Sequence, residues 1–270
     1  MFLIQRNRVQ NLSNSNNSNN SNNSNNSNNS NNLNNLNNLK ISNIVIKNLY
    51  FSIDQVLNKI QETIKNNGKI QIVTLNTEMV IDSLYNSVFL DILNNSEVIL
   101  ESNGVCFYVN KRYNLKINPI NGIDLAESII SKSYRVFILG TKQEILEKAV
   151  INLKNKYPNS NIVGFYNGYF EKDQEIIDLI NSKDVEVLLV GLGSPKQEFW
   201  IYNNINKINA NVFIGIGGSI DVWGEHFKRA PYIFRKFKLE WLYRTIQDPK
   251  RIKRNLKLFK FLFYFFIKKI

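Results

Sequence analysis

Short runs of apolar and β-branched residues recur along the middle of this 270-residue chain. Runs of this kind are typical of strands that are buried on both faces of a sheet. They lie at residues 44–46, 70–75, 98–100, 135–139, 161–165, 185–190 and 212–216. The runs therefore predict the strands of a covered sheet.

Between these runs, apolar residues recur every three or four positions, which is the spacing of one helix face. Such segments predict helices near residues 53–64, 78–93, 106–109, 124–131, 142–156, 174–181 and from 195 onward. Strands and helices that alternate in this way predict a mostly parallel sheet with helices on both faces. The expected fold class is therefore α/β and Rossmann-like.

After Arg229 the pattern changes, because apolar and aromatic residues lie among Lys and Arg and no strand is expected. This pattern predicts two or three amphipathic helices. Residues 261–267 are all apolar, yet about 20 such residues are needed to span a bilayer. We expect this segment either to lie on an anionic membrane or to pack on its own domain or a sister subunit. Five aromatic residues within 261–266 favour the membrane.

The charge distribution supports this division. The net charge is +12, and residues 228–270 hold 14 Lys and Arg against two acidic residues, so they carry the whole excess. A neutral body with a basic tail argues against nucleic-acid binding and for an anionic surface or ligand. One Cys and one His exclude an intrachain disulfide, a cysteine zinc cluster and a multi-histidine metal site.

The N-terminal residues 11–39 are almost entirely Asn and Ser, with a few Leu. Such a segment has too little apolar surface to offset the entropy of ordering, so we expect residues 1–40 to be disordered. The expected domains are then this segment, an α/β domain at 41–227 and a basic helical appendage at 228–270. The first residues do not resemble a signal peptide, which predicts a cytoplasmic protein.

The stretch Gly191–Glu198 joins the run 185–190 to a helix. We expect Ser194 as its N-cap and Pro195 in its first turn, where a missing N–H costs little. Free N–H groups at a helix start, together with Lys196, suit an anion such as a diphosphate. The alternative is an ordinary β–α turn. Neither a Gly-x-Gly-x-x-Gly fingerprint nor a P-loop is present.

Five segments occur in an order that resembles one family. They are Thr74–Glu78, Gly191–Glu198, Arg229–Pro231, Leu239–Arg244 and Pro249–Arg254. The chain resembles the WecG/TagA/CpsF glycosyltransferases (glycosyltransferase family 26) over about residues 44–255. The resemblance implies inverting transfer of N-acetylmannosamine, its uronate or glucose from a UDP-sugar to a polyprenyl-diphosphate-linked acceptor. The segment 249–258 looks most like the N-acetylmannosaminuronate-transferring branch.

The resemblance also implies how the leaving diphosphate is stabilised. Many glycosyltransferases use a metal held by Asp-x-Asp, a pair that this sequence lacks. Arg244, Arg251 and Arg254 match the family's C-terminal arginines, and Arg can grip phosphate oxygens with two hydrogen bonds. We therefore expect neither metal nor cofactor. The alternative is that these three residues contact only membrane headgroups.

Other matches suggest binding residues. Gln197 would orient donor or acceptor, while Thr74 and Asn76 form a polar pair that otherwise caps the helix after it. Asp221 matches a family acid but would equally suit a helix cap. The remaining expected substrate-binding residues are Gly104, Gly122, Gly191, Gly193 and Pro195.

Two positions depart from the family pattern. Asn103 stands where the family has its proposed general base, an Asp, and Pro119 replaces an Arg. An amide cannot accept the proton, so the base would come from Glu101 or Asp124. If residues 101–103 continue the strand, Glu101 and Asn103 share a face and Glu101 is the closer substitute. The alternative is a weakened relative that binds UDP-sugar or a partner without efficient turnover.

The expected partners follow from these matches. They are a UDP-sugar, a polyprenyl-diphosphate-linked sugar and an anionic membrane that meets residues 250–270, with a homo-oligomer left open and nucleic acid excluded. The expected location is the inner face of a membrane, as a peripheral protein. An adaptor that binds membrane or nucleic acid through the basic tail is the remaining alternative.

Overall fold

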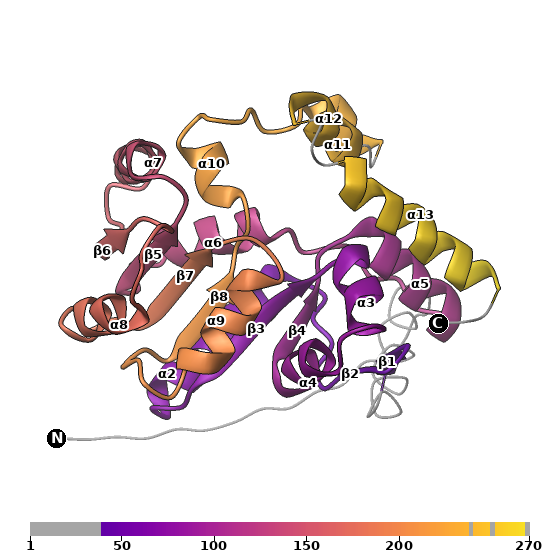
Figure 1. Cartoon of the computed structure of the whole chain (residues 1–270), viewed down its shortest axis with the longest axis horizontal. Helices are drawn as coiled ribbons and strands as arrows, with labels where there is room; N and C mark the ends of the chain where they lie inside the picture. Colours follow the sequence, from indigo (N-terminus) through magenta and orange to yellow (C-terminus); the bar gives the residue numbers. More distant parts are fainter. Residues whose placement is uncertain (1–38, 238–239, 249–251, 268–270) are drawn as a thin grey trace, which may run out of the picture. The chain divides into compact units, whose positions relative to one another are not determined.

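The protein is described from a computed structural model, which covers residues 39–237, 240–248 and 252–267. Its centre is a six-stranded parallel sheet in the order β4-β3-β8-β7-β5-β6 (Figure 1). The strands are β3 (Ile70–Leu75), β4 (Glu97–Leu100), β5 (Val136–Gly140), β6 (Ile162–Tyr166), β7 (Val187–Gly191) and β8 (Val212–Gly215). The expected α/β, Rossmann-like class is confirmed.

Neighbouring residues of a strand enter different cores, because side chains alternate across a sheet. In β7, Leu189 joins a core under one face, and Leu188 joins a core under the other. The first face is covered by α2 (Ile53–Lys65), α6 (Gly122–Ser131), α7 (Gln143–Lys156) and α10 (Ser219–Trp223). The second is covered by α8 (Asp173–Asn181) and α9 (Lys196–Asn204). Two covered faces explain why the strand sequences are mostly apolar.

A small hairpin precedes the main sheet. Strands β1 (Leu39–Ile41) and β2 (Ile44–Ile46) pair antiparallel, and the side chains of Leu39, Ile41, Ile44 and Ile46 are at most 2% exposed. Leu39 and Lys40 therefore belong to an ordered strand, two residues earlier than the expected boundary of the Asn/Ser-rich segment. The rest of that segment lies outside the described residues.

One expected helix is two helices. The predicted helix 78–93 is divided into α3 (Thr77–Ser83) and α4 (Ser87–Asn95). The side-chain oxygen of Asn86 accepts a hydrogen bond from the N–H of Phe89 at 2.9 Å and so begins a new helix. Asn76 caps α3 in the same way, through the N–H of Met79 at 3.1 Å.

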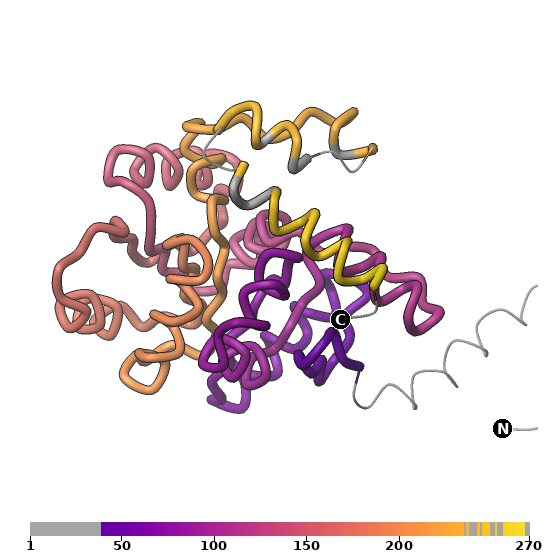
Figure 2. Tube along the Cα trace, turned by 45° about the vertical axis from the view of Figure 1, so that its right-hand side comes forward, coloured from indigo at the N-terminus to yellow at the C-terminus, as the bar shows by residue number. Residues whose placement is uncertain are grey.

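The described part of the C-terminal segment contains three helices, which agrees with the expected two or three: α11 (Tyr232–Lys236), α12 (Glu240–Gln247) and α13 (Ile252–Phe266). Helix α13 runs along α3 and α5 (Asn103–Tyr113), as Figures 1 and 2 show. Phe261 is 1% exposed and its ring lies 6.2 Å from that of Tyr108. Lys257 binds Asp82 at 2.7 Å and Glu78 at 3.1 Å. One face of α13 thus packs on its own domain.

The opposite face of α13 carries an exposed apolar stripe. Its members recur every three or four residues and are Ile252, Leu256, Phe259, Phe263 and Phe266. Each is more than half exposed. In the part of the chain that the structure covers, no helix has the length and hydrophobicity to cross a bilayer.

Candidate active site

A pocket of about 520 Å³ opens at the carboxyl ends of β5, β6, β7 and β8. This edge of a parallel sheet is where α/β proteins bind ligands. Its wall is formed by the turns that follow these strands and by the chain around α10 and α12. The lining residues are Thr141, Lys142, Ile145, Gly168, Tyr169, Gly191, Leu192, Gly193, Lys196, Gly217, Gly218, Asp221, His226, Phe227 and Asp248.

Three predicted binding residues line this pocket: Gly191, Gly193 and Asp221. A Cβ on Gly191 would lie 2.6 Å from Cδ1 of Ile220 and 2.9 Å from the carbonyl oxygen of Gly217, so the turn admits no side chain there. Gly193 has φ +79°, a left-handed conformation that glycine adopts without strain. Gly191 therefore lets the turns after β7 and β8 approach each other closely beside the pocket.

Asp221 lies inside α10 rather than at its start. The N-cap of α10 is Gly218, so the alternative of Asp221 as a helix cap is wrong. Its Oδ1 instead accepts a hydrogen bond from the hydroxyl of Thr141 at 2.5 Å. This bond ties α10 to the turn after β5, and both residues line the pocket.

The start of α9 is one residue later than expected. Pro195 occupies the N-cap position and α9 begins at Lys196, so the prediction of Ser194 as N-cap and Pro195 within the first turn is wrong. The reason is the tight turn at Gly193, whose carbonyl oxygen accepts a hydrogen bond from the N–H of Gln197 at 2.9 Å. Lys196 at the helix start lines the pocket.

Gln197 is 2% exposed and both ends of its amide are used within the protein. Its Oε1 accepts a hydrogen bond from the N–H of Gly217 at 3.0 Å, and its Nε2 donates to Oε1 of Glu198 at 2.7 Å. Burial, followed by the negative charge of Glu101, raises the pKa of Glu198, and contacts with Gln197 and Ser194 partly offset this. The amide of Gln197 thus joins the first turn of α9 to the turn after β8.

A second group of predicted residues lies at the ends of β3 and β4. Thr74 donates a hydrogen bond to the carbonyl oxygen of Gly215 at 3.4 Å, and Oε1 of Glu101 accepts one from the N–H of Gly122 at 3.1 Å. A Cβ on Gly122 would lie 3.5 Å from Oγ1 of Thr74 and 3.1 Å from Oε1 of Glu101. Thr74, Glu101 and Gly122 are therefore neighbours, whereas the side chain of Asn76 caps α3.

Asn103 is the first residue of α5 and does not continue the strand. The hydroxyl of Ser102 caps this helix by accepting a hydrogen bond from the N–H of Val105 at 3.3 Å, and β4 ends at Leu100. The expectation that Glu101 and Asn103 share a strand face is therefore wrong. A Cβ on the next residue, Gly104, would lie 2.6 Å from Cγ2 of Thr77, so α5 and α3 are in close contact there.

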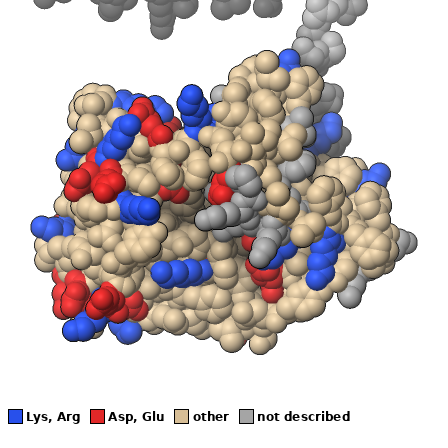
Figure 3. Space-filling model, turned by 45° about the horizontal axis from the view of Figure 1, so that its top comes forward, with Lys and Arg blue, Asp and Glu red and all other residues tan. Residues whose placement is uncertain are grey.

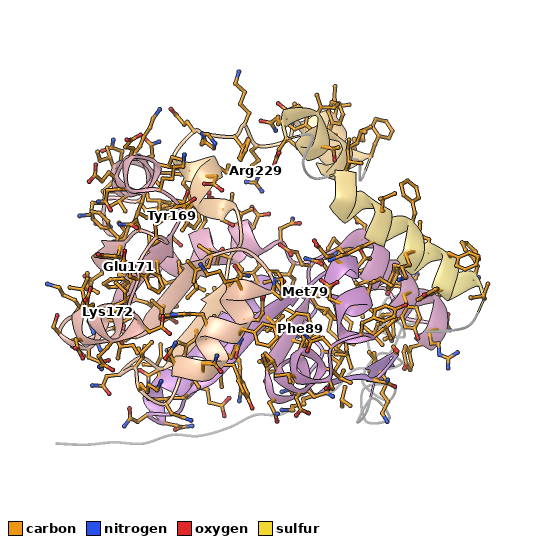
Figure 4. The ribbon with its side chains drawn as sticks, in the orientation of Figure 1. Met79, Phe89, Tyr169, Glu171, Lys172 and Arg229 are labelled. Carbon is orange, nitrogen blue, oxygen red and sulfur yellow. The ribbon has the colours of Figure 1, made fainter. Side chains whose placement is uncertain are left out.

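Asp124, the other candidate base, is already paired. Its Oδ1 binds the guanidinium of Arg229, and its Oδ2 accepts a hydrogen bond from the Asn121 amide at 3.1 Å. Arg229 lies between α10 and α11, on the upper side of the molecule in Figure 4. Both carboxylate oxygens of Asp124 are therefore bound by other side chains, whereas Oε1 of Glu101 accepts from a backbone N–H beside Thr74.

The side chains of the three predicted arginines lie outside the described part of the structure. Arg244 lies in α12 and Arg254 in α13, whereas the whole of Arg251 is outside it. The end of α12 does reach the pocket, because Asp248 lines it. Gln247 fixes this end through hydrogen bonds to the N–H and carbonyl oxygen of Lys228, at 2.7 and 2.9 Å.

Sequence reasoning missed several lining residues. Lys142, Tyr169 and His226 line the pocket, and Tyr169 is 73% exposed there (Figure 4). Lys142 and Tyr169 follow the ends of β5 and β6 within three residues, a signal that could have found them. His226 does not follow a strand, and it lines the pocket only because the turn after α10 folds back to it. Within the described residues no three His, Cys, Asp or Glu side chains gather as metal ligands would.

Comparison with known proteins identifies a family whose sequence model matches most of this chain. The family model described as "Glycosyl transferase WecG/TagA/CpsF family" matches residues 39–270. Similar curated proteins include the N-acetylglucosaminyldiphosphoundecaprenol N-acetyl-beta-D-mannosaminyltransferases of Staphylococcus aureus strains MW2 and N315. Each is 34% identical over 189 residues, which is 68% of this chain and 74% of the relative.

Proposed function

Because the chain belongs to the WecG/TagA/CpsF family of glycosyl transferases, we propose that it transfers a sugar from a UDP-sugar to a polyprenyl-diphosphate-linked acceptor in cell-surface polysaccharide biosynthesis. The relatives' names make UDP-N-acetylmannosamine the first donor to test, ahead of its uronate and UDP-glucose, and N-acetylglucosaminyl-diphosphoundecaprenol the first acceptor. The observation that carries the proposal is the pocket between the glycine turns of β7 and β8.

The pocket has the size and chemistry for a nucleoside diphosphate. Its volume of about 520 Å³ is within the usual range of small-molecule sites. Lys142 and Lys196 supply positive charge, and backbone N–H groups of the glycine turns would bind phosphate oxygens. Tyr169 offers an aromatic ring and Asp221 a carboxylate to the nucleoside.

The second group, at the ends of β3 and β4, is the proposed place of proton transfer. Glu101 takes the proton of the acceptor hydroxyl while the oxygen forms its bond to the anomeric carbon, and UDP leaves from the opposite side with the bonding electrons. Arg244, Arg251 and Arg254 then neutralise the departing diphosphate without a metal ion. The N–H of Gly122 donates a hydrogen bond to Oε1 of Glu101, and Thr74 lies close to both residues.

The C-terminal helices are the proposed contact with the membrane. The stripe Ile252, Leu256, Phe259, Phe263 and Phe266 faces away from the domain, and α11 and α12 expose Tyr232, Ile233, Phe237 and Ile246. Helix α13 contains Lys and Arg but no Asp or Glu. An apolar stripe flanked by positive charge suits the interface of an anionic bilayer. On the face in Figure 3, by contrast, the body shows both charges side by side.

The direct test is release of UDP from a panel of UDP-sugars, with and without a polyprenyl-diphosphate-linked N-acetylglucosamine, in the presence of a chelator. The proposal expects acceptor-dependent release that the chelator does not reduce. Release from none of the donors would contradict it.

A second candidate is supported by Asn103 and Pro119, which stand in place of the family's base and Arg. A weakened family member would bind UDP tightly in calorimetry without releasing it from any donor. The two candidates therefore differ in turnover and not in binding.

A further inference from the structure

Glu198 is a buried carboxyl group. It lies between the two halves of the site, which are the pocket and the group formed by Thr74, Glu101 and Gly122. It is 1% exposed, and its Oε2 makes no hydrogen bond to any described residue. No described cation forms an ion pair with it. A buried carboxylate without a positive partner is unfavourable, so Glu198 is unlike Asp124, which binds Arg229.

The contacts of Glu198 lead to both halves. On one side, its Oε1 accepts a hydrogen bond from Gln197, whose own Oε1 accepts one from the N–H of Gly217 in the pocket wall. On the other side, a Cβ on Gly215 would lie 3.0 Å from Oε1 of Glu198, and the carbonyl oxygen of Gly215 accepts the hydrogen bond of Thr74. Glu198 therefore lies where the pocket and the Glu101 group meet.

We propose that Glu198 is a positioning residue that works as a neutral carboxylic acid. It holds the amide of Gln197 in one orientation, and this amide in turn holds the N–H of Gly217. The position of the turn after β8, relative to Thr74, therefore depends on Glu198. The part of this inference that concerns UDP rests on the proposed function, whereas the part that concerns the turn does not.

A neutral Glu198 agrees with its surroundings. Burial and the charge of Glu101 both raise the pKa of Glu198, so a proton on it removes the repulsion between the two carboxyl groups. Where two acids lie close together, the one in the less polar environment keeps its proton and the other ionises.

Amide hydrogen exchange at Gly217 tests the inference without any ligand. In Glu198→Ala the exchange of this N–H becomes about fivefold to tenfold faster, the equivalent of one lost hydrogen bond. In Glu198→Gln it returns to nearly the wild-type rate, because the amide oxygen accepts from Gln197 and the NH₂ group replaces the hydroxyl. Glu97→Ala is the control, since Glu97 is a buried acid that binds Tyr50 and Asn48 away from the site.

Unchanged exchange at Gly217 in Glu198→Ala overturns the positioning role. Exchange in Glu198→Gln as fast as in Glu198→Ala overturns the neutral form, because Gln keeps the shape and lacks only the charge. Equal acceleration in Glu97→Ala would mean general destabilisation and would also overturn the inference.

Calorimetry with UDP on the same variants separates this inference from the proposed function. The affinity should fall in Glu198→Ala, recover in Glu198→Gln and stay unchanged in Glu97→Ala. Absence of UDP binding by the wild-type protein contradicts the proposed function alone, because the exchange result stands without it.

Discussion

At the scale of single residues, the account depends most on Glu101, because Asn103 cannot accept a proton. Glu101 lies beside Thr74 and Gly122, two other residues that the resemblance implies for substrate binding. The proposed base is therefore chosen by its neighbours in the fold rather than by the sequence motif alone.

Replacing Glu101 with Gln should lower kcat about 100-fold while leaving UDP affinity nearly unchanged, since general-base catalysis is typically worth that much or more. Steady-state kinetics with the lipid-linked acceptor measures this. Asn103→Asp is the companion variant. Turnover by Glu101→Gln at the wild-type rate, or a rise of orders of magnitude in Asn103→Asp, would mean that Glu101 is not the base.

The raised pKa of Glu198 also predicts how stability depends on pH. The pKa of Glu198 is higher in the folded than in the unfolded protein. Such an acid stabilises the fold fully at pH values below its pKa in the unfolded protein, and this stabilisation is lost as the pH rises through its pKa in the folded protein. Glu198→Gln has no such loss. The melting temperature of Glu198→Gln relative to wild type should therefore be higher at pH 8 than at pH 4, as scanning calorimetry would measure. A difference that does not change with pH would argue against a buried neutral acid.

Gly191 gives a steric prediction. Gly191→Ala places a Cβ 2.6 Å from Ile220 and 2.9 Å from the Gly217 backbone, so it should destabilise the protein by about 1–3 kcal/mol and weaken UDP binding. Gly68→Ala is the matched control, because its nearest neighbour atoms are at 3.5 Å. Denaturant unfolding and calorimetry would measure both effects, and equal effects of the two variants would contradict the close approach of the turns.

At the scale of elements, the apolar runs predicted the parallel sheet because strands covered on both faces need no polar alternation. The boundaries around polar residues were less predictable. Asn86 divides an amphipathic segment into α3 and α4, and Ser102 begins α5 before Asn103. Both residues act through one side-chain hydrogen bond, which periodicity does not detect.

The docking of α13 on α3 should depend on Lys257, which joins Glu78 and Asp82 across more than 170 residues of sequence. Lys257→Ala should cost up to about 1 kcal/mol and make the segment after α12 more sensitive to limited proteolysis. Lys59→Ala, which removes a local pair with Glu62, is the control. Equal cleavage of wild type and Lys257→Ala would show that the pair does not hold α13.

The exposed face of α13 should control membrane binding. A Phe259→Ser, Phe263→Ser variant should lose most of its salt-sensitive binding to phosphatidylserine vesicles, and it should remain folded because both rings are more than half exposed. Ile151→Ser, at an equally exposed position on α7, should bind as wild type does. Undiminished pelleting of the double variant together with a loss of self-association would instead identify the stripe as a contact between copies of this chain.

At the scale of the whole molecule, the carboxyl edge of the sheet brings together turns that lie far apart in sequence. The glycine motif at Gly191 predicted one wall of the pocket, whereas the places of Tyr169 and His226 depend on the strand order β7-β5-β6 and on the turn after α10. The hydrogen bonds that connect Glu198 to Gly217 through Gln197 were equally unpredictable from the sequence, because they depend on burial and on hydrogen-bond geometry.

The central claim is that UDP binds between the glycine turns of β7 and β8, with the C-terminal arginines closing over its diphosphate. A crystal structure of the 270-residue chain with UDP tests this most directly. The account predicts the diphosphate beside Lys142 and Lys196, within reach of at least one of Arg244, Arg251 and Arg254. A nucleotide bound away from this edge, with all three arginines directed elsewhere, would contradict it.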